Sequence, residues 1–303
     1  MKRKSTLSLI LMLVMALVIV GCGGGTSEPK QEDNGQNAAP ATSLSVGLIP
    51  AETKISPETL EKFRAYLEKE TGLKVTMNNY PDYNGVVEAL NFNKLDVAYL
   101  GPLTYVIAHE KGGAQAIVAK TAKGVPFYYS YILVHKDSKY NTLEDLIADK
   151  QNVDFAFGDP NSTSGSLIPG MELKARGVYR GKQDSDFKSI TFTMAHDVTA
   201  LSIQNKKVTA GAIDSAYYDK LVEKGTVDGT QFKKIWQSEK LFQYPFVVKK
   251  NMDAATIEKL QTAFLNLKDQ EILDAFAADG FVKATHQDYE AIEKAAKADG
   301  RLQ

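Results

Sequence analysis

The sequence FGDPNSTSG at residues 157–165 is the segment from which the rest of the chain can be understood. An apolar run at 154–157 predicts a short buried strand, and the pattern at 166–176 predicts a helix. A strand that turns into a helix leaves the first N–H groups of the helix without partners, and these groups attract anions. Ser162, Thr163 and Ser164 add hydroxyl donors there. The segment predicts either an anion site of neutral donors or an ordinary capped helix.

Length and composition bound the class of protein. The chain has 303 residues, which allows one large or two medium domains. Hydrophobic residues make up 44% and charged residues 24%, with a formal net charge of −1. There is no excess of basic residues, so nucleic acid is not expected as a partner.

The N-terminal residues predict export. A basic start at residues 2–4 is followed by an apolar run at 7–20, which is too short to span a bilayer comfortably. Cys22, the only cysteine in the chain, follows directly, and this ending resembles a bacterial lipobox. We therefore expect a signal peptide at 1–21 and a diacylglycerol group on Cys22. A plain signal peptide with an incidental cysteine is the alternative.

A polar linker follows the cysteine. Residues 23–43 contain no aromatic residue and no aliphatic residue larger than alanine, so they cannot bury enough surface to fold. We interpret residues 22–43 as a flexible tether. The folded part is then extracytoplasmic, held at the outer face of a membrane by the lipid anchor alone.

Strand and helix patterns alternate from residue 44 onward. A helix is expected to begin at Ser56 and Pro57 and to end at Gly72, whereas Gly85 lies in an expected loop at 81–85 before a short helix at 86–92. This β-α order predicts a mainly parallel sheet with helices on both faces and ligand-binding loops at the carboxyl ends of its strands. The expected strands are 44–49, 74–77, 96–100 and 115–120.

A second β-α repeat is predicted within 137–235, and the long β run at 128–136 is suited to cross between two lobes. Everything after Asp253 is predicted to be helical and to pack on the first lobe, reached by a second crossover near 236–244. The expected fold class is α/β, with two lobes joined by two crossover strands and a ligand cleft between them. Lobe 1 is expected at 44–130 plus 240–303, and lobe 2 at 131–239.

Several motifs, in the order of one known family, resemble PhnD-like phosphonate, phosphite or phosphate binding proteins of ABC importers. They are FGDPNSTSG at 157–165, YNGVVEA at 83–89, DVAYLGP at 96–102, YYSYILVHKD at 128–137 and Ala195-His196. The resemblance covers roughly residues 44–250. It implies a type II periplasmic binding protein that delivers a small phosphorus oxyanion to an ABC permease and ATPase, and we expect a monomer.

The resemblance also implies which residues hold the oxyanion. Hydroxyl and amide donors come from one lobe, phenolic O–H groups come from the first lobe and the crossover, and a histidine contacts an oxyanion oxygen. The positions that match are Ser162, Thr163, Ser164, Tyr83, Tyr128 and His196. Neutral donors of this kind satisfy a charged oxyanion without the cost of burying a cation beside it.

One departure from the family bears on the ligand. Aminoethylphosphonate binders place two acids against the ammonium group of the ligand, and those positions align here with Ala216 and Tyr244. A subsite for a cation is therefore expected to be absent. Asp214 lies nearby and is expected either to accept a P–OH proton or only to cap the next helix. The absence of a cation subsite, with Asp214 as an acceptor for P–OH, favours phosphite, phosphate or methylphosphonate as the ligand.

The alternative class is a secreted phosphoester hydrolase or a sensor domain on the same lobes. No Gly-x-Ser-x-Gly, His-Glu-x-x-His or Walker A pattern occurs in the sequence. A triad of Ser162, His196 and Asp214 would need contacts of hydrogen-bond length. The other histidines, at 109, 135 and 286, lack metal-ligand spacing, so neither a metal nor a cofactor is expected.

Overall fold

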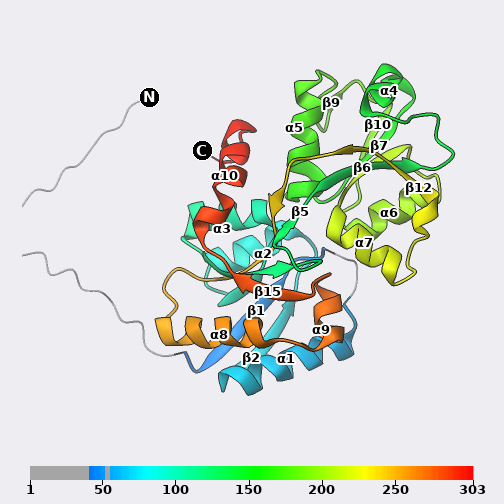
Figure 1. Cartoon of the computed structure of the whole chain (residues 1–303). Coiled ribbons are helices and arrows are strands. Elements are labelled where there is room, and N and C mark those ends of the chain that lie inside the picture. The colour runs from blue at the N-terminus through cyan, green and yellow to red at the C-terminus, as the bar shows by residue number, and fades with distance from the viewer. Residues whose placement is uncertain (1–40, 52–54, 303) are drawn as a thin grey trace, which may run out of the picture. The chain divides into compact units, whose positions relative to one another are not determined.

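The structure is a computed structural model that describes residues 41–51 and 55–302. The predicted signal peptide, the predicted lipid attachment at Cys22 and all but the end of the predicted tether lie outside the described residues. The described part forms two large sheets, each with its own helices, and two small two-stranded sheets (Figure 1). We name the six-stranded sheet and its helices lobe 1, and the five-stranded sheet and its helices lobe 2.

The sheet of lobe 1 has the order β15-β4-β14-β3-β1-β2. Its strands are β1 (Ser43–Leu48), β2 (Lys74–Asn79), β3 (Val97–Tyr99), β4 (Gln115–Thr121), β14 (Pro245–Val248) and β15 (Gly280–Lys283). Strand β1 pairs in parallel with β2 and β3, whereas β14 lies antiparallel between β3 and β4. The sheet is therefore mixed rather than mainly parallel as predicted, because β14, from the far end of the chain, lies between β3 and β4.

The prediction that everything after Asp253 is helical was wrong. Strand β15 pairs antiparallel with β4 and covers the edge of the sheet. Phe281 of this strand is buried, with its ring centroid 5.3 Å from that of Phe264 and 5.8 Å from that of Phe246. The segment forms a strand because β4 offers it an open edge and an apolar face, neither of which is visible in the local sequence.

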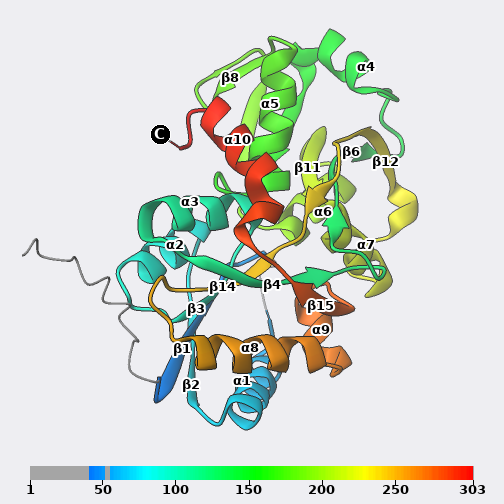
Figure 2. The same cartoon turned by 60° about the vertical axis from the view of Figure 1, so that its left-hand side comes forward.

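The helices of lobe 1 follow the cap signals of the sequence. They are α1 (Pro57–Thr71), α2 (Tyr83–Asn91), α3 (Pro102–Gly112), α8 (Ala254–Asn266), α9 (Gln270–Ala275), η4 (His286–Tyr289) and α10 (Glu290–Ala298). Ser56 accepts a hydrogen bond from the N–H of Thr59 at 3.1 Å, and Gly72 ends α1 with φ 71°. Figure 2 shows the lower part of α10 next to α3.

The predicted loop at 81–85 was also wrong in its extent. Asp82 accepts a hydrogen bond from the N–H of Gly85 at 2.8 Å, so it is the cap of α2 and the helix begins at Tyr83. Tyr83 thus lies in the rigid first turn of a helix rather than in a loop.

The sheet of lobe 2 has the order β10-β7-β11-β6-β12. Its strands are β6 (Ser130–His135), β7 (Asp154–Phe157), β10 (Ser189–Phe192), β11 (Ala210–Asp214) and β12 (Phe232–Gln237). The helices are α4 (Leu143–Ala148), α5 (Ile168–Ala175), α6 (His196–Gln204) and α7 (Ser215–Glu223), with short turns η1 (Lys150–Asn152), η2 (Thr163–Leu167) and η3 (Gly229–Gln231). A small hairpin, β8 (Tyr179–Gly181) with β9 (Asp184–Ser185), flanks α5.

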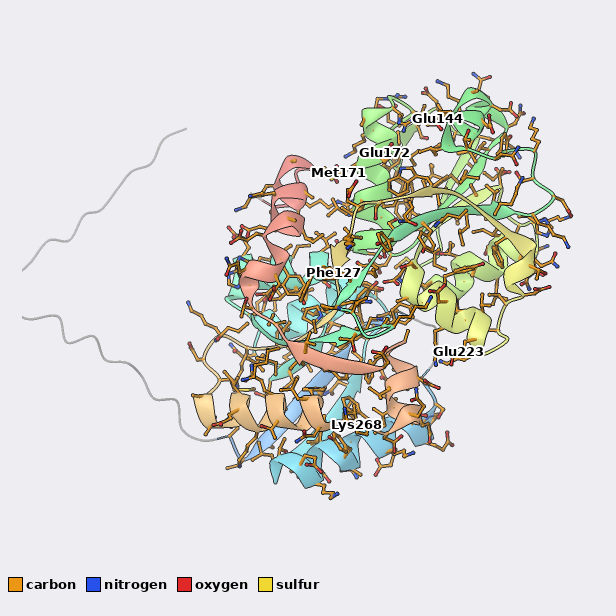
Figure 3. The ribbon with its side chains drawn as sticks, viewed as in Figure 1. Phe127, Glu144, Met171, Glu172, Glu223 and Lys268 are labelled. Carbon is orange, nitrogen blue, oxygen red and sulfur yellow. The ribbon has the colours of Figure 1, made fainter. Side chains whose placement is uncertain are left out.

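The chain passes between the lobes on two paired strands. The predicted long strand at 128–136 is divided into β6 and the separate strand β5 (Phe127–Tyr128), which pairs antiparallel with β13 (Leu241–Phe242). Phe127, labelled in Figure 3, contacts the ring of Phe242 across this pair at 5.6 Å. The lobe boundaries expected at 130/131 and 239/240 lie close to this crossover and stay a prediction. Within 41–51 and 55–302, no helix has the length and apolarity needed to cross a membrane.

Candidate anion-binding site

The loop after β7 is closed tightly on itself. The N–H of Gly158 donates to the carbonyl of Gly165 at 2.8 Å. A Cβ on Gly165 would lie 2.9 Å from Ser162 Oγ, so no larger residue fits there without a shift of the loop. Ser162 caps the turn by accepting the N–H of Gly165 at 3.0 Å. The helix predicted from 166 begins earlier, as the π-helical turn η2, and continues as α5.

The three hydroxyl residues of this loop are all buried, but their oxygens have different partners. Ser162 Oγ accepts the capping bond within the loop, and Thr163 Oγ1 accepts the N–H of Leu103, in α3 of lobe 1, at 2.8 Å. Each of these two hydroxyls keeps its own proton for donation. Ser164 Oγ has no hydrogen-bond partner in the protein.

Tyr128 and Asp214 share this property with Ser164. Both are fully buried, and neither the Tyr128 hydroxyl nor Asp214 Oδ2 has a partner in the protein. The other oxygen of Asp214 accepts the N–H groups of Ala216 at 2.7 Å and Tyr217 at 3.0 Å, so this residue does cap α7. The three residues lie close together, because burial and the charge of Asp214 raise the pKa of Tyr128 whereas the side chain of Ser164 lowers it. Since buried polar atoms are normally hydrogen-bonded, their oxygens point to a polar ligand.

Tyr83 brings a further hydroxyl from lobe 1. Its backbone N–H donates to Asp159 Oδ2 in the loop of lobe 2 at 3.3 Å. Burial raises the pKa of the Tyr83 hydroxyl, and the side chains of Tyr244 and Ser162 beside it partly offset the rise. The phenol therefore stays protonated and lies next to the capping serine of the loop.

His196 begins α6 and faces both lobes. Its backbone N–H donates to the carbonyl of Ala51 at 3.0 Å. The ring Nδ1 accepts the backbone N–H of Asp214 at 3.5 Å, so in the neutral ring Nε2 carries the proton and donates to the Tyr244 hydroxyl at 3.1 Å. Burial, together with the charge of Lys120, lowers the pKa of His196 to about 3, which keeps the ring neutral.

The hydrolytic triad considered from the sequence is not assembled. Both ring nitrogens of His196 are engaged elsewhere, one by a backbone N–H and the other by Tyr244. The capping oxygen of Asp214 is directed at α7, and Ser162 Oγ accepts from its own loop. The arrangement lacks the nucleophile–base contact that covalent catalysis needs.

Two charged side chains, those of Asp214 and the buried Lys120, mainly set the charge of the site. Burial raises the pKa of Asp214 to about 6, although Lys120 and the N–H groups of α7 act in the opposite direction. Burial also raises the pKa values of Tyr128 and Tyr244. At neutral pH the site therefore combines phenolic and hydroxyl donors with one carboxylate oxygen that can accept.

The sequence predictions missed an aromatic wall behind these residues. Tyr244 is fully buried, and its ring centroid lies 5.7 Å from that of Tyr99, 5.6 Å from Tyr128 and 5.7 Å from Tyr217. The hydroxyls of Tyr99 and Tyr217 lie 3.2 Å apart. Lys120 was missed as well, although a lysine inside the otherwise apolar run AIVAKT was a usable signal.

The structure thus places all seven predicted ligand-binding residues at buried positions, drawn from α2, β5, the loop after β7, the start of α6 and the end of β11. Among residues 41–51 and 55–302, no group of three or more His, Cys, Asp or Glu is placed to hold a metal ion. The site is suited to enclose a small anion from two sides.

Two α/β lobes on paired crossover strands, with polar donors from both lobes meeting between them, define a type II substrate-binding protein of the periplasmic class. Residues 46–289 match the family described as "ABC transporter, phosphonate, periplasmic substrate-binding protein", and the chain belongs to this family.

Known relatives agree with this assignment. The chain is 35% identical over 227 residues to the phosphonates-binding periplasmic protein of Escherichia coli K12, covering 74% of this chain and 65% of that protein, just under two thirds of its length. It is 32% identical to the phosphate-import protein PhnD of Mycolicibacterium smegmatis, covering 88% of this chain and 83% of the relative.

A solved structure supports the fold. The binding protein component of an ABC phosphonate transporter from Pseudomonas aeruginosa is 27% identical and superimposes with a TM-score of 0.75, covering 86% of this chain and 87% of that one. The family consists of substrate-binding components of transporters rather than enzymes, so the hydrolase alternative has no support.

Proposed function

We propose that this chain captures a small phosphorus oxyanion between its lobes and delivers it to an ABC importer. The ligand class is phosphite, phosphate or methylphosphonate. The observation that carries the proposal is that Tyr128, Ser164 and Asp214, all among the predicted ligand-binding residues, each have a buried oxygen without a protein partner. Two are hydroxyls that can donate to P–O oxygens, and the third is a carboxylate oxygen that can accept from P–OH.

In this proposal the other donors complete the shell around the ligand. Ser162 and Thr163 each keep a hydroxyl proton, because the bonds made to their oxygens use only lone pairs. Tyr83 donates from lobe 1. His196 was expected to contact an oxyanion oxygen, but its Nε2 donates to the Tyr244 hydroxyl at 3.1 Å, so its proposed role is to position Tyr244. The ligand is gripped from both lobes, so binding and lobe closure are coupled.

Asp214 gives the proposal its chemical selectivity. An ionised carboxylate oxygen in a buried site repels an anion unless a proton lies between them. Phosphate, phosphite monoanion and methylphosphonate monoanion carry a P–OH group, whereas sulfate at neutral pH carries no proton. We therefore expect the site to reject sulfate.

The positions aligned with the two ammonium-binding acids favour a small ligand. Ala216 has no charge, and the Tyr244 hydroxyl already accepts from His196 at 3.1 Å. Asp159, a second buried acid, lies in the loop after β7 and accepts the N–H groups of Asn161 at 2.7 Å and Tyr83 at 3.3 Å. An aminoalkyl ammonium would find no carboxylate at the family's two positions. The names of the relatives, one for phosphonates and one for phosphate, are consistent with the ligand class but differ on the member.

Isothermal titration calorimetry tests the proposal. Phosphite, phosphate, methylphosphonate, aminoethylphosphonate and sulfate are titrated into the purified protein at pH 7. One of the first three is expected to bind tightly with one site per chain, and the last two at least a hundredfold more weakly. The proposal fails if none of the five binds, or if sulfate binds as well as the best phosphorus ligand.

We further propose that Cys22 carries the lipid anchor and that the protein acts as a monomer on the outer face of the membrane. The support is the basic start, the apolar run and the cysteine placed directly after it. Cys22→Ala is expected to move the protein from the membrane fraction to the soluble fraction, and light scattering is expected to give the mass of one chain. Retention of Cys22→Ala in the membrane would contradict the anchor.

The delivery partner is tested with the importer itself. Ligand-loaded protein is expected to stimulate ATP hydrolysis by its reconstituted permease–ATPase complex, because the closed form presents both lobes to the permease together. Equal stimulation by ligand-free protein would count against coupling through closure.

A further inference from the structure

A buried lysine lies directly behind the aromatic wall of the site. Lys120 is in β4 of lobe 1, and its side chain is 0% exposed. Its ammonium group donates to the carbonyl of Phe276 at 2.9 Å, just beyond the end of α9. A fully buried lysine is rare because its charge must be compensated inside the protein.

The ammonium group also faces two tyrosine rings of the site. Lys120 Nζ lies 4.1 Å from the ring centroid of Tyr217 and 5.0 Å from that of Tyr244. Both distances are within the range of a cation–π interaction, and burial strengthens such a contact. Tyr217 belongs to α7 of lobe 2, so its contact with Lys120 joins the two lobes.

These two rings connect the lysine to the polar groups of the site. The ring of Tyr217 stacks on His196, with 5.3 Å between centroids, and the backbone N–H of Tyr217 donates to Asp214 at 3.0 Å. The hydroxyl of Tyr244 accepts from His196 at 3.1 Å. One aromatic side chain therefore separates the ammonium group from the groups proposed to surround the oxyanion.

We propose that Lys120 supplies the positive charge of the anion site from behind Tyr217 and Tyr244, and that its contact with Tyr217 favours the closed arrangement of the lobes. The inference rests on the proposed function, because it assumes that an oxyanion binds at this site. Residues around the ligand provide neutral donors and one carboxylate, and the charge of Lys120 offsets the charge of that carboxylate. In a buried site of low dielectric, a charge one ring away still acts strongly.

Lys120 is thus a positioning and specificity-determining residue. Its charge cancels that of Asp214, so the carboxylate does not leave the site with a net negative charge. Its two aromatic contacts orient the rings that hold His196 and the Tyr244 hydroxyl. The competing explanation is purely structural, since Lys120 also ties the end of α9 to β4 through Phe276.

The two explanations differ in the affinity that they predict for Lys120→Met, which removes the charge and keeps most of the volume. Removing one member of a buried charged set is destabilising because its partners stay buried, here the carbonyl of Phe276 and the carboxylate of Asp214, so the melting temperature is expected to fall under both explanations. If Lys120 serves the anion, the folded variant binds the ligand about 30-fold more weakly, which is about 2 kcal/mol. If it is only structural, the affinity of the folded fraction is unchanged.

Lys220→Met is the matched control. Lys220 is 9% exposed and also links the lobes, but its partners are the carboxylates of Asp274 at 2.6 Å and Glu223 at 3.0 Å rather than aromatic rings. Glu223 lies near the end of α7 (Figure 3). This control is expected to lower the melting temperature and to change the dissociation constant less than threefold.

Tyr217 provides a second test that does not depend on the lysine variant folding. Tyr217→Phe keeps the ring that faces the ammonium group, and we expect an affinity within threefold of the wild type. Tyr217→Leu removes the ring and is expected to weaken binding at least tenfold. Equal affinities for the two variants would overturn the role assigned to the ring.

The assay is calorimetry with inorganic phosphate, phosphite and methylphosphonate on each variant, together with thermal unfolding of the ligand-free proteins. Failure of the wild type to bind any of the three would refute the proposed function itself. Tight binding by the wild type with unchanged binding by Lys120→Met would overturn this inference alone. A loss of affinity in folded Lys120→Met that Lys220→Met does not share would support it, and an equal loss in both variants would overturn it.

Discussion

Tyr128→Phe tests the ligand shell with the least disturbance of the fold. The substitution removes one oxygen and keeps the ring that contacts Tyr244 at 5.6 Å. Within the protein this hydroxyl has no hydrogen-bond partner, so its removal takes away a buried polar group without breaking a bond between residues. We therefore expect the free energy of unfolding to stay the same or to rise.

Ligand binding is expected to respond in the opposite direction. A hydrogen bond to a charged group contributes roughly 1.5–3 kcal/mol, which corresponds to a dissociation constant raised about 10- to 150-fold. The assay is calorimetry with the best ligand of the panel, combined with urea unfolding of the ligand-free protein. A variant that binds as the wild type does would refute the role of this hydroxyl.

Tyr66→Phe is the matched control for Tyr128→Phe. The hydroxyl of Tyr66 donates to the carbonyl of Ala263 at 2.6 Å, between α1 and α8 of lobe 1. Its loss is expected to lower the free energy of unfolding by about 1 kcal/mol and to leave the dissociation constant unchanged. The two variants should therefore separate stability from affinity.

Three further predictions concern the loop and the carboxylate. Burial raises the pKa of Asp214 to about 6, so above that pH the proton shared between Asp214 and the ligand must come from the ligand. Phosphite binding should therefore weaken about tenfold per pH unit once phosphite also loses its last acidic proton. Asp214→Asn should abolish this pH dependence in a calorimetric pH series. Gly165→Ala would place Cβ 2.9 Å from Ser162 Oγ, and we expect a loss of roughly 1–3 kcal/mol in thermal unfolding together with weaker binding. Thr163→Val removes the oxygen that accepts the N–H of Leu103 at 2.8 Å between the lobes, so the affinity for the ligand should fall about tenfold. A variant with both the stability and the affinity of the wild type would contradict this.

Local sequence signals identified the parts of the site that depend on neighbouring residues. The strand at 154–157, the glycine turn and the hydroxyl residues follow each other within one segment, and the structure forms the expected strand, turn and helix there. The position of Asp214 just before α7 likewise indicated a helix cap, and its Oδ1 accepts two N–H groups of that helix. Caps and turns are determined by a few adjacent residues, which is why they can be predicted.

The features that were missed depend on contacts between distant segments. Strand β14 enters the sheet of lobe 1 from position 245 onward and lies between β3 and β4, so no local pattern specifies its neighbours. Tyr99 and Tyr217 are 118 positions apart in the chain, yet their hydroxyls lie 3.2 Å from each other. Lys120 gains its role only because β4 places it under rings from two other segments.

A crystal structure with the best-binding ligand of the panel tests the central claim most directly. We predict one phosphorus oxyanion enclosed between the lobes, with oxygens within hydrogen-bond distance of the Tyr128 hydroxyl and Ser164 Oγ, and with its P–OH group on Asp214 Oδ2. An oxyanion bound elsewhere, or bound between the lobes without contacting these three oxygens, would contradict the account.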